Sequence, residues 1–243
     1  MRRHLRHLAA IALVGVAVGG VSSCGLWDSS TFEDDGKVSQ KITSVRLDNG
    51  SGAVEVRGEK DVDEISVHRK VEYRGDRPEG ASHRVENGVL ILGGCGKSCS
   101  VSYTVEVPVG TRVGGQTSNG AVTLSQVGEV DVTTSNGAVK VDDAAGPVKV
   151  RTTNGRITGR GLKGKSIDAE TSNGGIELAP ATAQDIRAET TNGAVSLTVP
   201  AGRYRISAKN DNGHQSIGIP NDPSGDHRID LTTDNGAITV KAA

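Results

Sequence analysis

The chain has 243 residues, of which 23% are charged and 2% aromatic, and its formal net charge is −1. This near-neutral balance excludes the strongly basic surface that nucleic-acid binding requires, so we expect no nucleic-acid partner. The few aromatic residues also leave little of the ring surface on which sugars usually stack.

Residues 1–23 have the layout of an export signal. Three arginines in the first six residues precede an apolar run over residues 8–21, which is too short and glycine-rich for a membrane span. The run ends in Val-Ser-Ser-Cys at residues 21–24, which resembles the lipobox of bacterial lipoproteins. That resemblance implies cleavage before Cys24, a lipid on its sulfur and a place on the extracytoplasmic face of the cell membrane. The alternative is an ordinary secretory signal followed by a free cysteine.

Residues 24–40 predict a polar, lipid-anchored tether, because acidic residues and a Ser-Ser pair dominate them. Removal of residues 1–23 deletes three arginines and no acid, so the net charge moves from −1 to −4. The mature surface is therefore weakly acidic.

Residues 41–110 are interpreted as a first rung of strands followed by an insertion. Alternating apolar residues from Val45 lead to Ser51-Gly52, and Val54 and Val56 follow. The pattern then fails until about residue 111, and Asn87-Gly88 has the signature of a hairpin turn. We therefore expect residues 59–110 to form an antiparallel meander that covers an edge of the main sheet.

Two cysteines, Cys95 and Cys99, fall in a glycine-rich loop of this insertion. With Cys24 lipidated they form an even pair in an oxidising compartment, which predicts a local disulfide. A redox-active pair would need a Cys-x-x-Cys motif at a helix start, and a metal site would need further ligands nearby. We expect no metal and no cofactor.

From residue 111 to 243 the chain repeats one phrase. Thr-Ser-Asn-Gly-Ala-Val at residues 117–122 recurs from Thr134, and related copies follow. Successive Asn-Gly pairs are separated by 17, 18, 19, 19, 20 and 23 residues. A period near 20 is typical of stacked repeats that are too small to fold alone.

Aligned on their asparagines, most copies carry Val, Ile, Leu, Ala or Thr at offsets −6, −4, −2, +3 and +5. This alternation marks two short strands joined at a glycine corner, and no helical stripe is sustained after residue 25. We therefore predict an all-β, single-chain parallel β-helix, or β-solenoid, right-handed by the usual chirality of parallel crossovers.

Stacked coils would place equivalent residues about 4.8 Å apart, so the asparagines should point inward and form a buried ladder of hydrogen-bonded amides. The predicted ladder consists of Asn119, Asn136, Asn154, Asn173, Asn192, Asn212 and Asn235. The alternative is a series of Asn-Gly hairpins in an antiparallel meander, which would not require an identical inward Thr-x-Asn at each turn.

The repeated phrase, the Val-Glu-Val-Pro-Val-Gly sequence at residues 105–110 and the lipobox together resemble the bacterial "putative adhesin" domain of unknown function. The resemblance covers about residues 41–240. It implies a β-solenoid on a secreted or lipid-anchored envelope protein, and the family has no established catalytic residues. Ser51 in place of a ladder asparagine, and Asn210 in place of a threonine, depart from the pattern.

No catalytic constellation is expected, although some β-helix enzymes that cleave polysaccharides use clustered acids on an outer face. His214 and His227 fall in corner loops without a nucleophile beside them. The candidate acids are Asp142, Asp143, Glu170, Glu189, Asp211 and Asp234.

An outward column of small hydroxyl side chains precedes the asparagines and forms a candidate binding strip: Ser118, Ser135, Thr153, Ser172 and Thr191. We expect a non-enzymatic surface protein that binds a glycan or an envelope protein through this strip. The alternatives are an accessory protein of envelope-stress signalling and a polysaccharide lyase or hydrolase. The uncapped last strand, which ends at Ala243, also predicts end-to-end self-association.

Overall fold

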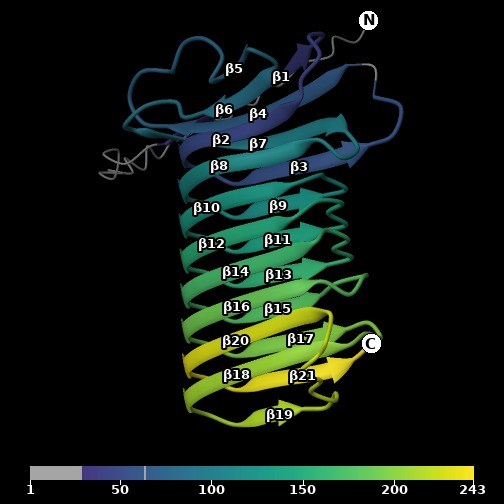
Figure 1. The fold of residues 1–243 in the computed structure, drawn as a ribbon. Helices are drawn as coiled ribbons and strands as arrows, with labels where there is room; N and C mark the ends of the chain where they lie inside the picture. The colour runs from purple at the N-terminus through teal and green to yellow at the C-terminus, as the bar shows by residue number, and fades with distance from the viewer. Residues whose placement is uncertain (1–28, 63) are drawn as a thin grey trace, which may run out of the picture.

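The computed structural model describes residues 29–62 and 64–243, so the predicted signal peptide and Cys24 lie outside the described residues. All regular elements in this part of the chain are strands, which form a two-sheet rod (Figure 1). No helix among the described residues is long and apolar enough to cross a membrane.

Eleven strands form sheet A and ten form sheet B. In spatial order, sheet A contains β1 (Ser30–Val38), β4 (Ile65–Tyr73), β7 (Cys99–Pro108), β3 (Val54–Glu59), β9 (Val122–Ser125), β11 (Val139–Asp142), β13 (Ile157–Arg160), β15 (Ile176–Ala179), β17 (Val195–Val199), β21 (Ile238–Ala242) and β19 (Gln215–Ile217). Sheet B contains β18 (Tyr204–Asn212), β20 (His227–Asn235), β16 (Asp185–Asn192), β14 (Ser166–Asn173), β12 (Val148–Asn154), β10 (Val130–Asn136), β8 (Arg112–Asn119), β2 (Ser44–Ser51), β6 (Val89–Gly93) and β5 (His83–Glu86).

The parallel coiling predicted from the repeats is confirmed. Thr134 pairs with Thr117 and with Thr152, and Asn136 pairs in the same register on both sides. Each Asn-Gly pair of the repeats is therefore a corner that joins the two strands of one rung, and neighbouring rungs are parallel, which excludes the hairpin alternative there. The turn at Asn87-Gly88 is the expected hairpin, because β5 and β6 are antiparallel neighbours.

The core lies between the two sheets and consists of columns of like side chains. Because strand residues alternate between faces, the apolar offsets of successive copies stack on one another inside the rod. One buried column in sheet B comprises Val113, Val130, Val148, Ile167, Ile186 and Ile229. A buried column in sheet A comprises Val122, Val139, Ile157, Ile176, Val195 and Ile238.

At each corner the backbones of neighbouring rungs approach so closely that only glycine fits. A Cβ on Gly137 would overlap the carbonyl oxygen of Gly120, and the same overlap recurs at Gly155 with Gly137 and at Gly174 with Gly155. The glycine of the repeated phrase is therefore needed for stacking.

The order of the rungs in space differs from their order in the sequence at both ends of the rod. Near the N-terminus, β2 and β3 lie between the rung β8–β9 and a further rung, β6–β7 (Figure 1). Near the C-terminus, β20 and β21 lie between β16–β17 and the outermost rung, β18–β19. Each end of the chain is thus folded back by one rung.

The antiparallel meander expected over residues 59–110 forms in part. The strand β4 pairs antiparallel with β1 and β7, and β5 pairs antiparallel with β6. However, β6 and β7 also pair in parallel with β2 and β3, so residues 89–108 form a rung of the solenoid. Their sequence lacks the Asn-Gly corner, and periodicity therefore could not reveal it.

The prediction of a tether over residues 24–40 is wrong for residues 30–38. They form β1, which pairs with β4 along nine residues, and Phe32 packs edge-on against Tyr73 with ring centroids 5.8 Å apart. The acidic residues obscured a strand whose Asp34 is held by an arginine of β4.

The predicted open edge at the C-terminus is also misplaced. The strand β21 is covered by β19, and the unpaired edge of the described rod belongs to β18 and β19. In this last rung Asn210 and Gln215 occupy inward positions and hydrogen-bond to each other through their side chains. Such polar residues close the end of a solenoid core, so end-to-end self-association stays a prediction that now concerns this edge.

Replacement of Gly137 by Ala should destabilise the rod by about 1–3 kcal/mol, because the added methyl group overlaps the Gly120 carbonyl. Chemical denaturation would measure the difference. Gly50→Ala is the matched control, since nothing lies within 4 Å of a Cβ at Gly50. Equal stability of the two variants would refute the close approach at the corner.

Candidate binding surfaces

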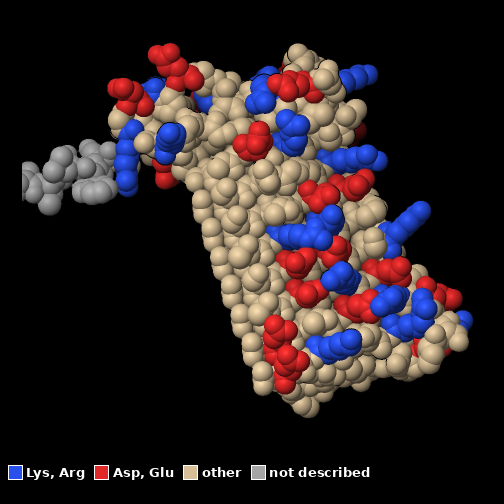
Figure 2. Space-filling model, turned by 60° about the vertical axis from the view of Figure 1, so that its left-hand side comes forward, with Lys and Arg blue, Asp and Glu red and all other residues tan. Residues whose placement is uncertain are grey.

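The predicted strip lies on the outside of the corners, where β8, β10, β12, β14 and β16 end. Its five residues are all exposed and follow one another from rung to rung, because the threonine before and the asparagine after each of them pair in register. Figure 2 shows a band without charged residues along this side of the rod. The strip is thus a straight row of small hydroxyl groups on a backbone fixed by the glycine corners.

The asparagine ladder forms, but the prediction that its amides are buried is wrong. Asn136 Nδ2 donates to Asn119 Oδ1 at 2.9 Å, and Asn154 Nδ2 donates to Asn136 Oδ1 at 2.8 Å. Beyond these, Asn173, Asn192, Asn235 and Asn212 continue the row in that spatial order at 2.9–3.0 Å. All seven asparagines are exposed, because the chain turns the corner between the last inward threonine and the next inward apolar residue.

The threonine two positions before each asparagine except Asn212 takes the inward place. Thr152 Oγ1 donates to the Gly137 carbonyl at 3.1 Å, and Thr171 Oγ1 donates to the Gly155 carbonyl at 3.0 Å. These hydroxyls satisfy the carbonyl of the preceding corner glycine from inside the rod. From Thr152 onward a buried threonine column and an exposed asparagine column therefore hold the corners from opposite sides, whereas the buried hydroxyls of Thr117 and Thr134 make no hydrogen bond.

Three of the six candidate catalytic acids are paired with neighbouring cations. Glu170 pairs with Arg151 at 2.8 Å, and Glu189 pairs with Arg187 at 2.6 Å. Asp142 pairs with Lys140 at 2.6 Å, whereas Asp143, Asp211 and Asp234 are exposed. The described residues contain no group of three or more His, Cys, Asp or Glu placed to hold a metal ion.

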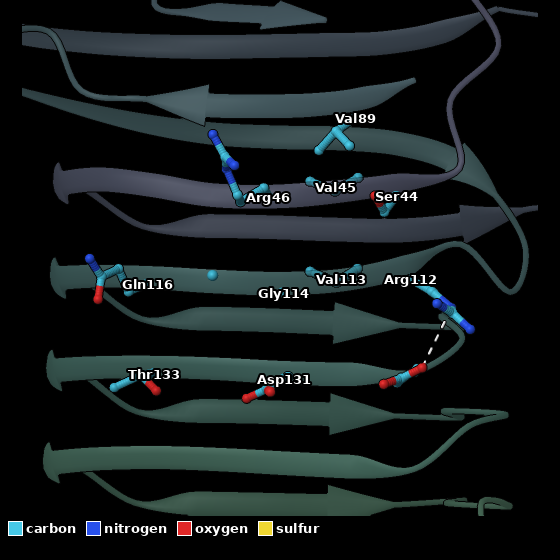
Figure 3. A pocket seen from close by; sticks show the side chains of 12 residues that line it. Ser44, Val45, Arg46, Val89, Arg112, Val113, Gly114, Gln116, Asp131 and Thr133 are labelled. Carbon is cyan, nitrogen blue, oxygen red and sulfur yellow. Dashed lines mark ion pairs between the residues drawn. The ribbon is translucent and has the colours of Figure 1, made fainter. Parts of the chain in front are cut away.

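A groove of about 560 Å³ lies on the outer face of sheet B, where β2, β8 and β10 are neighbours (Figure 3). Its floor is Gly114, which pairs with Arg46 of β2 on one side and with Asp131 of β10 on the other. Gln116 and Thr133 also line it. Sequence reasoning missed this groove, although Gly114-Gly115 inside a strand is an unusual pair that could have signalled it.

At the N-terminal end, Arg69 holds a cluster of polar groups. Its guanidinium donates to both carboxylate oxygens of Asp34, at 2.5 and 2.7 Å, and to Ser82 Oγ at 3.0 Å. The hydrogen bond from Arg69 lowers the pKa of Asp34 below its ordinary value, and burial raises the pKa of Tyr103 to about 12. Burial, with Arg69 nearby, lowers the pKa of His83. These contacts tie β1 to β4 and close this end of the core.

Cys95 and Cys99 form a disulfide with a Cα–Cα distance of 5.8 Å. It closes the turn that leads into β7, next to the paired end of β4 at Tyr73. The bond thus fixes the connection between β6 and β7 in the outermost rung at the N-terminal end.

A family model described as Toastrack DUF4097 matches residues 111–241. The rod is similar to the crystal structure of a putative adhesin from Bacteroides fragilis, with 13% identity, a TM-score of 0.50 and coverage of 88% of this chain and 97% of that one. A putative cell adhesion protein from Clostridium sporogenes matches with 12% identity and a TM-score of 0.39, over 88% of this chain and 100% of that one. The comparison with curated proteins found no match. The Bacteroides structure supports the solenoid fold.

The substitution Asn154→Asp should destabilise the rod in a pH-dependent way. A carboxylate cannot donate to Asn136 Oδ1, whereas a protonated carboxyl can, so folding should raise the pKa of Asp at this position above about 3.9. A raised folded pKa means that stability is retained below the unfolded value and lost as the pH rises through the folded value.

The control is Asn154→Ala, which loses the two amide hydrogen bonds and should cost about 1–2 kcal/mol at every pH. Denaturant unfolding between pH 3 and pH 8 would compare the two variants, with the range chosen to span about 3.9. Parallel pH profiles would contradict a ladder in which Asn154 is a donor.

Proposed function

This chain belongs to the Toastrack DUF4097 family, and on that premise we propose that it is a non-enzymatic, lipid-anchored binding protein of the cell surface. The rod presents the strip formed by Ser118, Ser135, Thr153, Ser172 and Thr191 to a repetitive partner, such as a glycan or an envelope protein. The names of the two similar crystal structures, both of which mention adhesion, support this role.

The observation that carries the proposal is the regularity of the strip. Neighbouring rungs of a parallel sheet are about 4.8 Å apart, so the hydroxyl groups repeat at this interval along a straight line. The corner glycines and the asparagine ladder fix their positions before any partner binds, which reduces the entropy lost on binding. A row of weak, equal contacts suits a partner that is itself periodic.

The polar chemistry of the rod supports binding rather than catalysis. Glu170 and Glu189 are engaged by arginines on an exposed sheet face, where no enclosing wall excludes water. A catalytic acid needs a protected substrate site, and these arginine-paired carboxylates stand on an open sheet face.

The lipid anchor at Cys24 would hold the N-terminal end of the rod at the membrane. Cys24→Ser removes the sulfur that takes the lipid, so the variant should lose its diacylglyceryl group and its membrane association. Mass spectrometry of the exported protein and fractionation of the cells would measure both effects. Unchanged membrane association of a variant without the lipid would rule out this mode of anchoring.

The triple substitution of Ser135, Thr153 and Ser172 by Lys should abolish binding of the protein to its native cell envelope. Three exposed cations would break the neutral row without touching the core, so thermal unfolding should change little. Retention of the purified protein on isolated envelopes is the measurement.

The matched control places three lysines at Thr158, Ser196 and Thr239, which face outward from sheet A. This control should keep full envelope binding. Equal binding of the two triple variants would show that the strip is not the contact surface.

A further inference from the structure

A single side chain is missing from the otherwise continuous outer face of sheet B. On the outward side of β2, β8 and β10, Gly114 lies at the centre of a grid of polar side chains. Its neighbours across the strands are Arg46 and Asp131, and its neighbour along β8 on one side is Gln116. The groove in Figure 3 is the space that this missing side chain leaves.

The fold itself does not strictly require a glycine at this position. A Cβ on Gly114 would lie 3.3 Å from the carbonyl oxygen of Asp131, which a small shift accommodates. The next residue differs, because Gly115 has a φ of 108° and a Cβ there would overlap the carbonyl of Leu47. A glycine inside a strand costs roughly 0.5–1 kcal/mol relative to alanine, so its presence at residue 114 calls for another reason.

The rim of the groove offers both hydrogen-bond donors and acceptors. Arg46 is exposed and makes no hydrogen bond or ion pair with another described residue, so its guanidinium is available to an anion. Its side chain extends toward β6 in Figure 3, and a change of rotamer brings the guanidinium toward Gly114. Across the floor, Asp131 is exposed and contacts a cation only at 4.0 Å, through Lys149. Arg112 is engaged with Glu129 at 3.5 Å at the edge of the same groove.

We propose that this groove binds an acidic saccharide of the hexuronate class. The carboxylate pairs with Arg46, whose fork of N–H donors matches a carboxylate in two parallel hydrogen bonds. The ring lies on the bare backbone of Gly114, and its hydroxyl groups donate to Asp131 and exchange hydrogen bonds with Gln116 and Thr133. The strands that carry Arg46 and Asp131 are about 10 Å apart, which leaves room for one sugar ring between them.

The position of the groove disfavours an extended peptide as the ligand. Its three strands, β2, β8 and β10, are paired on both edges, so no free backbone groups remain to which a peptide strand could add. A saccharide needs only the side chains and the flat floor. Because the groove contains no aromatic platform, the affinity of one site should be low, and binding would gain from several sugars in one polymer.

The groove lies on the sheet face, whereas the strip lies on the corners, so the two surfaces can be tested separately. Binding of a saccharide to the purified protein does not depend on the envelope contact proposed for the strip. Loss of saccharide binding in the groove would leave envelope binding by the strip unaffected, and the reverse also holds.

The test is a titration of the purified full chain with trigalacturonate, followed by calorimetry or ligand-observed NMR at low ionic strength. Maltotriose serves as the neutral saccharide and triglutamate as the acidic peptide. Arg46→Gln should weaken trigalacturonate binding about tenfold or more, because it removes a charge-assisted pair. Gly114→Val should remove binding by filling the groove.

Two control variants match these changes. Arg156→Gln removes the same charge from an exposed arginine on the corner, outside the groove, and should bind as the native protein does. Gly175→Val introduces the same steric contact as Gly114→Val, because a Cβ at Gly175 would also lie 3.3 Å from a backbone carbonyl oxygen, that of Ala194. Thermal unfolding of each variant checks that the rod is intact, and Arg46→Gln remains decisive if Gly114→Val fails to fold.

Three results would overturn the proposal. The first is an absence of trigalacturonate binding by the native protein. The second is an equal loss of affinity in Arg46→Gln and Arg156→Gln, which would indicate general charge attraction. The third is binding of triglutamate as tight as that of trigalacturonate, with the same response to Arg46→Gln, which would assign the groove to acidic peptides.

Discussion

The structure depends on the close approach of backbones at the corners of the solenoid. A parallel rung can sit in register on its neighbour only if the chain reverses without a side chain in the way, and the corner glycines meet that demand. From Thr152 onward, an inward threonine hydroxyl and an outward asparagine amide then hold the turn from its two sides. In-register stacking of Val, Ile and Leu follows from this constraint, and so does the straightness of the rows on the surface.

The sequence predicted the repeating part of the rod because each copy carries its own signal. The alternation of apolar residues and the shared corner defined the strands, the parallel register and the stacking of the asparagines. The prediction that Asn136 and its equivalents point inward was wrong. It assumed that side chains keep alternating between faces up to the asparagine, whereas the chain bends there. Hydrogen bonding between amides proved compatible with an exposed position.

The ends of the rod could not be predicted in the same way. Nothing in the local pattern of β6 and β7 or of β18 and β19 records which rung lies outermost, because spatial order depends on long connections rather than on periodicity. The strand β1 was hidden by its acidic residues, of which Asp34 pairs with Arg69 of β4. The groove at Gly114 is likewise a property of three strands, and no single repeat displays it.

The folded-back order of the C-terminal rungs has a mechanical consequence. In a solenoid whose last strand in sequence is also the outermost strand in space, that strand pairs on one side only and can detach first. Here the last strand in sequence, β21, pairs with β17 on one side and with β19 on the other. To pull β21 out of the sheet, a force must therefore break its backbone hydrogen bonds to both neighbours at once.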